Sequence, residues 1–217
     1  MKSESAVIEA RPNRADLIRR GRHLEYFTIG YNSLEGLIAV VAGLFAGSIA
    51  LVSFGFDSLI EVTSGSILLW RLHADVNEER RERVEAISLR IVGALFVLLA
   101  LYVTYDSVKS LIRREAPNES LVGIVLAAVS LVIMPLLVRA KRRVARAINS
   151  GALMADSKQT ELCTYLSAIL LAGLLLNALL GWWWADPIAA LIMVPIIVKE
   201  GIEALRGETC CDEGACH

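Results

Sequence analysis

Long apolar segments alternate with short polar ones along almost the whole chain, and this pattern predicts helices that cross a membrane. A bilayer core about 30 Å thick needs roughly 20 apolar helical residues. Six segments approach that length, at residues 26–46, 49–70, 89–108, 121–138, 151–180 and 187–205. We therefore expect an all-α, polytopic membrane protein with six transmembrane helices and both termini on one side.

The segments between the spans are too short to form a second folded domain. A polar arm occupies residues 1–24, a polar loop is expected at 71–90, and a Cys-rich tail follows at 207–217. None of them can bury a hydrophobic core of its own. We divide the chain into the arm, a six-helix transmembrane domain over 25–206, and the tail.

The distribution of Lys and Arg fixes the expected orientation. Eighteen of these residues fall on the side of the two termini, three fall on the other side, and Lys158 lies inside the fifth span. Because cytoplasmic loops are enriched in Lys and Arg, both termini are predicted to be cytoplasmic. The arm lacks the apolar core of a cleavable signal peptide, which fits a multi-pass protein of a bacterial-type cell membrane.

Composition supports the membrane assignment and narrows the function. Apolar residues make up 55% of the 217 residues, and the mean hydropathy is +0.55. The net charge of −1 gives no basic surface for a nucleic acid. Metalloprotease motifs such as H-E-x-x-H are absent from the sequence, so we expect no enzyme and no bound cofactor.

Two carboxylates near the middle of the second span are the first candidate site. Asp57 and Glu61 are four residues apart and project from one helical face. An ionised carboxylate in hydrocarbon costs at least a few kcal/mol unless a cation compensates it. A bound or transported cation would do so, and an ion pair with Lys158, the only cation placed inside the apolar segments, is the structural alternative.

The fifth span carries a second polar cluster. Asp156, Gln159 and Cys163 are spaced by three and four residues, so they share one face of a helix antiparallel to the second span. If the two helices touch, Glu61 faces Gln159 and Asp57 faces Cys163. Carboxylates, an amide oxygen and a thiolate form a four-coordinate site typical of zinc or cadmium. Cys163 as a small buried hydrophobe and Asp156 as a helix-start acid remain open.

Further candidate ligands lie in the first span and in the tail. Asn32 and Glu35 share a face of the first span, where they serve either as accessory ligands or as a polar helix contact. The tail offers three thiols and an imidazole that could capture a soft metal or belong to an unstructured end. These tail residues are Cys210, Cys211, Cys216 and His217.

These segments resemble the membrane half of the cation diffusion facilitator (cation efflux) family. Residues 47–61, with Asp57 and Glu61, are similar to the second helix of that family, and residues 154–163 are similar to its fifth. The sequence Trp-Ala-Asp-Pro at 184–187 is similar to the start of its sixth helix. The resemblance covers about residues 26–206.

The resemblance implies export of a divalent metal, typically zinc or cadmium, in exchange for protons. The metal would bind at Asp57, Glu61 and positions 159 and 163. The family usually has His and Asp on the fifth helix where this chain has Gln159 and Cys163. Since Gln cannot titrate, proton coupling would move to Glu61, Asp57 or the Cys163 thiol.

The resemblance also bears on assembly, because the family's C-terminal cytoplasmic domain has no counterpart in this sequence. We expect a short form, in which a homodimer would be held through membrane helices within the lipid bilayer. A different class of function is also open: a membrane-embedded metal sensor or adaptor, in which the tail binds metal and a partner protein responds.

Overall fold

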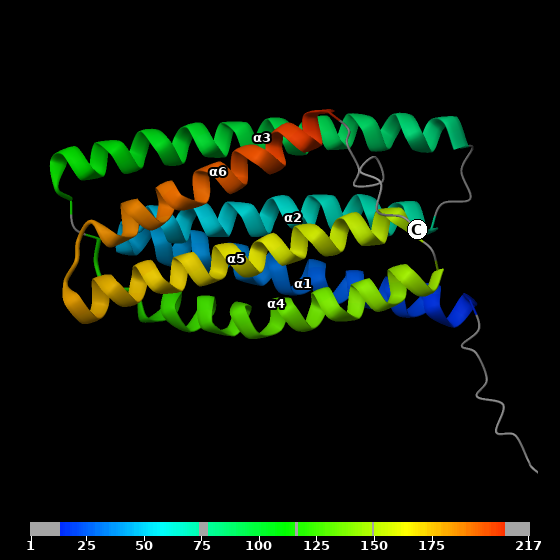
Figure 1. Cartoon of the computed structure of the whole chain (residues 1–217), viewed down its shortest axis with the longest axis horizontal. Helices are drawn as coiled ribbons and strands as arrows, with labels where there is room; N and C mark the ends of the chain where they lie inside the picture. The colour runs from blue at the N-terminus through cyan, green and yellow to red at the C-terminus, as the bar shows by residue number, and fades with distance from the viewer. Residues whose placement is uncertain (1–13, 74–77, 116, 149, 207–217) are drawn as a thin grey trace, which may run out of the picture.

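The computed structural model describes residues 14–73, 78–115, 117–148 and 150–206, and these residues form six α-helices and no strand. Figure 1 shows the helices lying side by side in alternating directions in one bundle, with α6 running toward the end where α1 starts. The expected all-α, six-helix fold is confirmed. The helices are α1 (Arg14–Ala46), α2 (Ile49–His73), α3 (Glu78–Arg113), α4 (Leu121–Ile148), α5 (Gly151–Leu180) and α6 (Ala185–Arg206).

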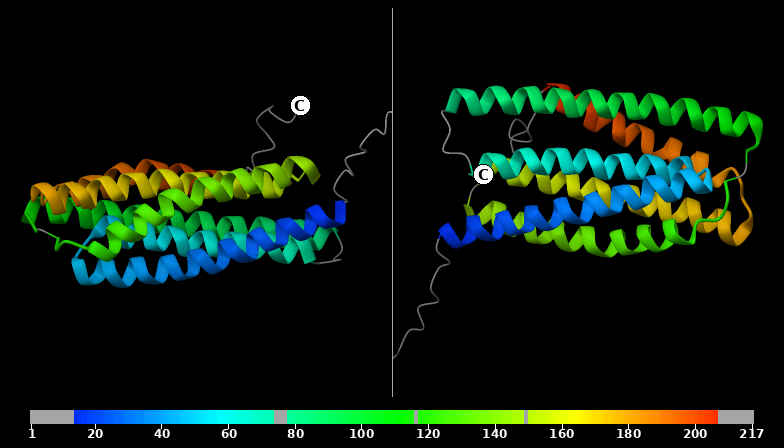
Figure 2. Two further views of the ribbon diagram at one scale, coloured as in Figure 1. Left: turned by 90° about the horizontal axis from the view of Figure 1, so that it is seen from below. Right: turned by 180° about the vertical axis from the view of Figure 1, so that it is seen from behind.

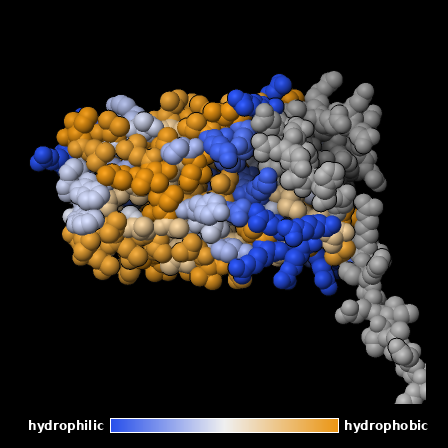
Figure 3. Space-filling view, viewed as in Figure 1, coloured by the Kyte–Doolittle hydropathy of each residue, from blue (hydrophilic) through white to orange (hydrophobic). Residues whose placement is uncertain are grey.

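Five of these helices are long and apolar enough to cross a membrane, and α6 is the exception among the described helices. α6 combines an apolar middle with Asp186 at its start and with Lys199, Glu200 and Glu203 near its end. Large apolar side chains such as Leu44, Phe45 and Leu179 face outward. Figure 3 shows that apolar surface covers much of one face, whereas hydrophilic residues gather toward the right-hand end of the view.

Several helices extend well beyond the apolar segments that predicted them. α1 begins at Arg14, α3 begins at Glu78, and α4 continues to Ile148 rather than ending near 138. The expected polar loop at 71–90 is therefore mostly helical, with only residues 74–77 outside the described helices. Glu, Arg, Lys and Ala are good helix formers, so a helix continues past the end of its apolar stretch.

Three pairs of helices pack most closely: α1 against α2, α3 against α6, and α4 against α5. α2 also contacts α3, α5 and α6. In Figure 2, left, α5 and α6 lie on one side of the bundle and α1 and α2 on the other. Two glycines bring α3 and α6 into backbone contact: a Cβ at Gly93 would lie 2.7 Å from the Gly201 carbonyl oxygen.

A buried carboxylate fixes the turn between α1 and α2. Asp186, in the first turn of α6, is 1% exposed and accepts a 2.8 Å hydrogen bond from the Ile49 backbone N–H and another bond from the Ser48 hydroxyl. The first N–H groups of a helix have no partner within the helix, and a carboxylate at this position interacts favourably with the positive end of the helix dipole. Asp186 therefore caps α2 from another helix and ties α6 to it.

We expect Asp186→Ala to lower the free energy of unfolding by about 1–3 kcal/mol, because it leaves buried N–H and hydroxyl groups without an acceptor. Thermal unfolding of the detergent-solubilised protein would measure this. Asp106→Ala is the control, since Asp106 pairs with Lys109 on the surface at 3.7 Å. Equal effects of the two substitutions would contradict the capping role.

Candidate metal centre

The two carboxylates of α2 lie inside the bundle, where α2 contacts α5. Asp57 is 9% exposed and Glu61 is 2% exposed. The contact between the second and fifth helices is as expected from the sequence. Residue by residue the pairing differs, because the Thr160 hydroxyl of α5 donates a 2.8 Å hydrogen bond to Glu61 Oε1. Gln159, the residue expected to face Glu61, is half-buried.

Cys163 lies one turn along α5 from Thr160 and is a buried free thiol. Its thiol is buried near the carboxylates of Glu61, Asp57 and Glu35. Among the described residues, no three His, Cys, Asp or Glu side chains lie close enough together to hold one metal ion in this conformation. Metal binding by Asp57, Glu61, Gln159 and Cys163 remains a prediction, and it requires these groups to move closer together.

The accessory candidates of the first span have different surroundings. Glu35 accepts hydrogen bonds from the Tyr31 hydroxyl at 3.0 Å and from the Ser58 hydroxyl of α2 at 3.1 Å. It therefore makes a polar contact between α1 and α2. Asn32 is fully buried, and neither polar atom of its amide has a hydrogen-bond partner in the described part of the chain. An unpaired buried amide is costly, so Asn32 is available to bind a further group.

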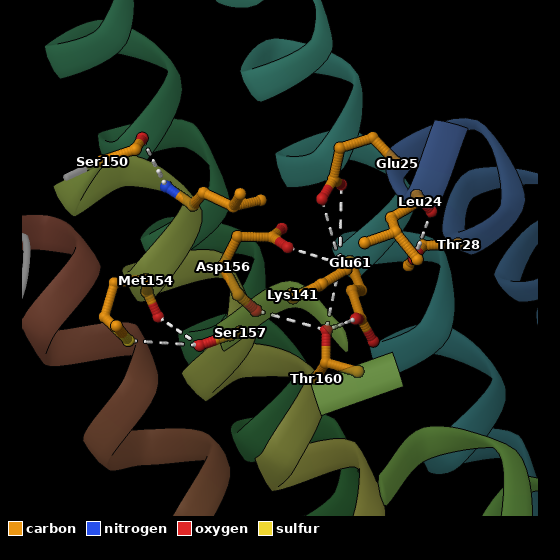
Figure 4. A network of polar contacts seen from close by, with 11 residues as sticks. Leu24, Glu25, Thr28, Glu61, Lys141, Ser150, Met154, Asp156, Ser157 and Thr160 are labelled. Atoms are coloured by element: carbon orange, nitrogen blue, oxygen red, sulfur yellow. Dashed lines mark hydrogen bonds and ion pairs between the residues drawn. The ribbon is translucent and has the colours of Figure 1, made fainter. Parts of the chain in front are cut away.

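A buried lysine makes a second polar centre beside Glu61 (Figure 4). Lys141 of α4 is fully buried, and its ammonium contacts the Asp156 carboxylate, Glu25 Oε1 at 3.4 Å and the Thr160 hydroxyl at 3.2 Å. We call Glu25, Glu61, Lys141, Asp156 and Thr160 the ion layer. Its members come from α1, α2, α4 and α5.

The ion layer corrects two statements made from the sequence. The expected fourth span at 121–138 leaves Lys141 in the connection that follows it and makes Lys158 the only cation inside the apolar segments. α4 continues past residue 138, so Lys141 lies inside the bundle, whereas Lys158 is exposed. Asp156 pairs with Lys141. α5 begins at Gly151 and has no acidic residue in its first turn, so Asp156 is not a helix-start acid.

Helical periodicity contained the information that places Lys141 inside. The buried positions of α4 include Met134, Leu137, Val138, Val144 and Ala145, and Lys141 falls on the same stripe at spacings of three and four. Thr160 and Glu25 gave no comparable pattern. Glu25 lies in a stretch rich in charges, and a hydroxyl beside Gln159 has no distinguishing sequence context.

The ion layer contains more negative charge than positive charge. One ammonium faces the carboxylates of Glu25 and Asp156, with Glu61 connected through Thr160. Glu61 Oε2 and Asp156 Oδ1 have no hydrogen-bond partner among the described residues. Buried carboxylate oxygens without partners are costly, so protons or a further cation are needed to balance this charge.

The arrangement defines a helical membrane protein with an acidic interior, and comparisons with known proteins agree. Residues 27–208 match the model of the cation efflux transmembrane domain. The chain belongs to the cation efflux family. The Cys-rich tail, with Cys210, Cys211, Cys216 and His217, lies outside the described residues.

Curated relatives carry transporter and magnetosome names. The chain is 28% identical to the magnetosome protein MamB of Paramagnetospirillum magneticum, over 76% of this chain and 57% of the relative. It is 25% identical to the cation-efflux pump FieF of Shewanella oneidensis, over 76% and 58%. It is 30% identical to FieF of Citrobacter koseri, over 73% and 55%. The chain thus spans little more than half the length of these relatives.

We expect Thr160→Val to lower the free energy of unfolding by about 1–3 kcal/mol, because Glu61 loses a donor and Lys141 an acceptor inside the bundle. Thr160→Ser keeps the hydroxyl and should stay close to the unmodified protein. Thermal unfolding in detergent distinguishes them. If both variants lose the same stability, packing of the methyl group rather than the hydrogen bonds accounts for the effect.

Proposed function

We propose that this protein exports divalent heavy-metal cations, with zinc and cadmium as the preferred ions, in exchange for protons. The metal would bind between α2 and α5. The observation that carries this proposal is the burial of Asp57, Glu61 and Cys163 together where α2 contacts α5, in a member of the cation efflux family. Relatives named cation-efflux pumps support the same class of activity.

The choice of metal follows from the ligand chemistry. A thiolate disfavours the hard cations magnesium, calcium and manganese, and carboxylates with one sulfur suit zinc or cadmium. Gln159 would supply an amide oxygen as the fourth ligand. The half-buried position of Gln159 means that α5 or the Gln159 side chain must turn toward Glu61 when metal binds.

Proton coupling follows from competition for the same groups. Carboxylates and a thiol must lose protons before they bind a cation, so proton binding and metal binding oppose each other. A proton gradient then drives metal the other way, provided that the metal-bound and protonated forms favour different conformations. With Gln159 unable to titrate, we assign the coupling to Asp57, Glu61 and Cys163.

The proposed orientation places both termini in the cytoplasm of a bacterial-type cell. Arg139, Arg142, Arg143 and Arg146 gather at one open hollow at the end of α4, which is the end where α1 begins and α6 ends. Such clusters favour the cytoplasmic side of a membrane. We further propose a homodimer held through membrane helices, whose apolar outer faces are shared between lipid and the partner.

In proteoliposomes with an acidic interior, the wild-type protein should accumulate zinc or cadmium, because protons leaving the vesicle drive metal inward. Asp57→Asn keeps the side-chain shape but removes the charge, and Asp57→Ala also removes volume. Both should reduce uptake at least about tenfold, since a buried charge contributes more than one kcal/mol to cation binding. Uptake is measured with a radioactive metal isotope or with a metal-sensitive fluorescent dye inside the vesicles.

The control for Asp57 is Glu115→Ala, which removes an exposed acid that pairs with Arg113. Uptake by this variant should match that of the wild type. Unchanged uptake in both Asp57 variants would refute the site assignment.

Cys163→Asp should shift selectivity from cadmium toward zinc, because oxygen is a harder ligand than sulfur. The measurement is the ratio of initial zinc and cadmium uptake rates under one pH gradient, extended to cobalt, nickel, iron and manganese. Cys163→Ser provides a matched control for side-chain size. A ratio that stays constant in both variants would mean that Cys163 only fills space.

A further inference from the structure

The ion layer lies between Glu61 and the end of the bundle where the chain begins and ends. Along α5, Asp156 lies about one turn nearer to that end than Thr160, which contacts Glu61. Along α1, Glu25 lies 11 residues after the start of the helix at Arg14. A cation that enters from this end and moves toward Glu61 therefore meets Glu25 and Asp156 before it reaches Glu61.

A covalently tethered cation already occupies that position. The Lys141 ammonium contacts Asp156, Glu25 and the Thr160 hydroxyl. Lys141, Glu25 and Thr160 are fully buried, and Asp156 is 6% exposed. Figure 4 shows the side chains of Glu25, Asp156 and Thr160 converging on the ammonium from three directions. Its contacts hold α1, α4 and α5 together, and Thr160 extends the connection to α2.

The carboxylates have capacity for more positive charge than one lysine supplies. Asp156 Oδ1 and Glu61 Oε2 have no hydrogen-bond partner in the described ranges, and both residues are more than nine-tenths buried. Two carboxylates in direct contact with Lys141 and a third one hydrogen bond away form an environment that attracts a divalent cation more strongly than a single ammonium.

We propose that Lys141 is an internal counter-cation that competes with the transported metal for Glu25 and Asp156 and closes the route to Glu61 when no metal is present. The proposal rests on the proposed transport function. A divalent cation arriving at Asp156 displaces the ammonium, which loosens the contacts among α1, α4 and α5. When the metal leaves, Lys141 returns and balances the carboxylates again.

This mechanism gives Lys141 opposite effects on binding and on turnover. Because the ammonium and the metal compete for the same oxygens, the lysine weakens metal binding. Because the ammonium replaces the departing metal, it also prevents an uncompensated acidic interior and so favours release. Removing the charge should therefore tighten metal binding while slowing the transport cycle.

The test compares Lys141→Met with Lys141→Arg, using cadmium binding to the detergent-purified full chain by calorimetry and cadmium uptake in proteoliposomes. Lys141→Met should lower both Kd and KM by roughly tenfold and lower the maximal rate by a similar factor. Lys141→Arg keeps the charge, so its Kd and KM should stay close to those of the wild type. A scaffold role alone would reduce stability and maximal rate without shifting Kd.

The matched control is Arg142→Gln, which removes a cation at the next position of α4 that pairs with Glu161 of α5 at 2.5 Å in a half-exposed place. Its Kd should equal that of the wild type. A second comparison covers the case in which Lys141→Met does not fold. The double variant Lys141→Met/Asp156→Asn, which loses one charge of each sign, should bind cadmium more tightly than Asp156→Asn alone.

Two results would overturn the inference, and only the second of them also refutes the proposed function. If the wild type binds cadmium and neither comparison shows tighter binding without Lys141, the competition is refuted while metal transport stands. If the wild type neither binds nor moves zinc or cadmium, the proposed function and the inference built on it both fall.

Discussion

The contact of Lys141 with Asp156 and Glu25 is the interaction on which the interior of this protein depends. Moving an ammonium or a carboxylate out of water costs several kcal/mol, and only close partners of opposite charge offset that cost. The three residues lie on α4, α5 and α1, so the requirement to pair them constrains where these helices meet. Thr160 connects this group to Glu61 and thus to the candidate metal ligands on α2.

The cost of moving polar groups out of water also explains which parts of the fold could be predicted. A span of about 20 apolar residues is a strong indication of a membrane helix, and all six expected elements are present in the described chain. The ends of the helices were harder to place, because hydropathy marks where a helix leaves the bilayer and not where its hydrogen bonding stops. α4 shows the difference, since its last turns carry four arginines and remain helical.

The candidate site was predictable where spacing alone decides position. Asp57 and Glu61 are a turn apart on α2, and Cys163 is on the face of α5 directed toward them, as the spacings of four and seven indicate. Thr160 and Lys141 depend instead on the rotation of two helices about their axes. A rotation of 100° exchanges Thr160 for Gln159 opposite Glu61, and the spacing of polar residues alone does not fix that rotation.

Asp186 caps α2 at one end of the bundle, so the helices are held together differently at the two ends. At one end, a carboxylate of α6 accepts hydrogen bonds from backbone N–H groups of α2. At the other end, α1, α4 and α5 are held by charges that an incoming cation can exchange. The first end is suited to act as a pivot and the second as the part that opens, so the bundle need not move as two rigid halves.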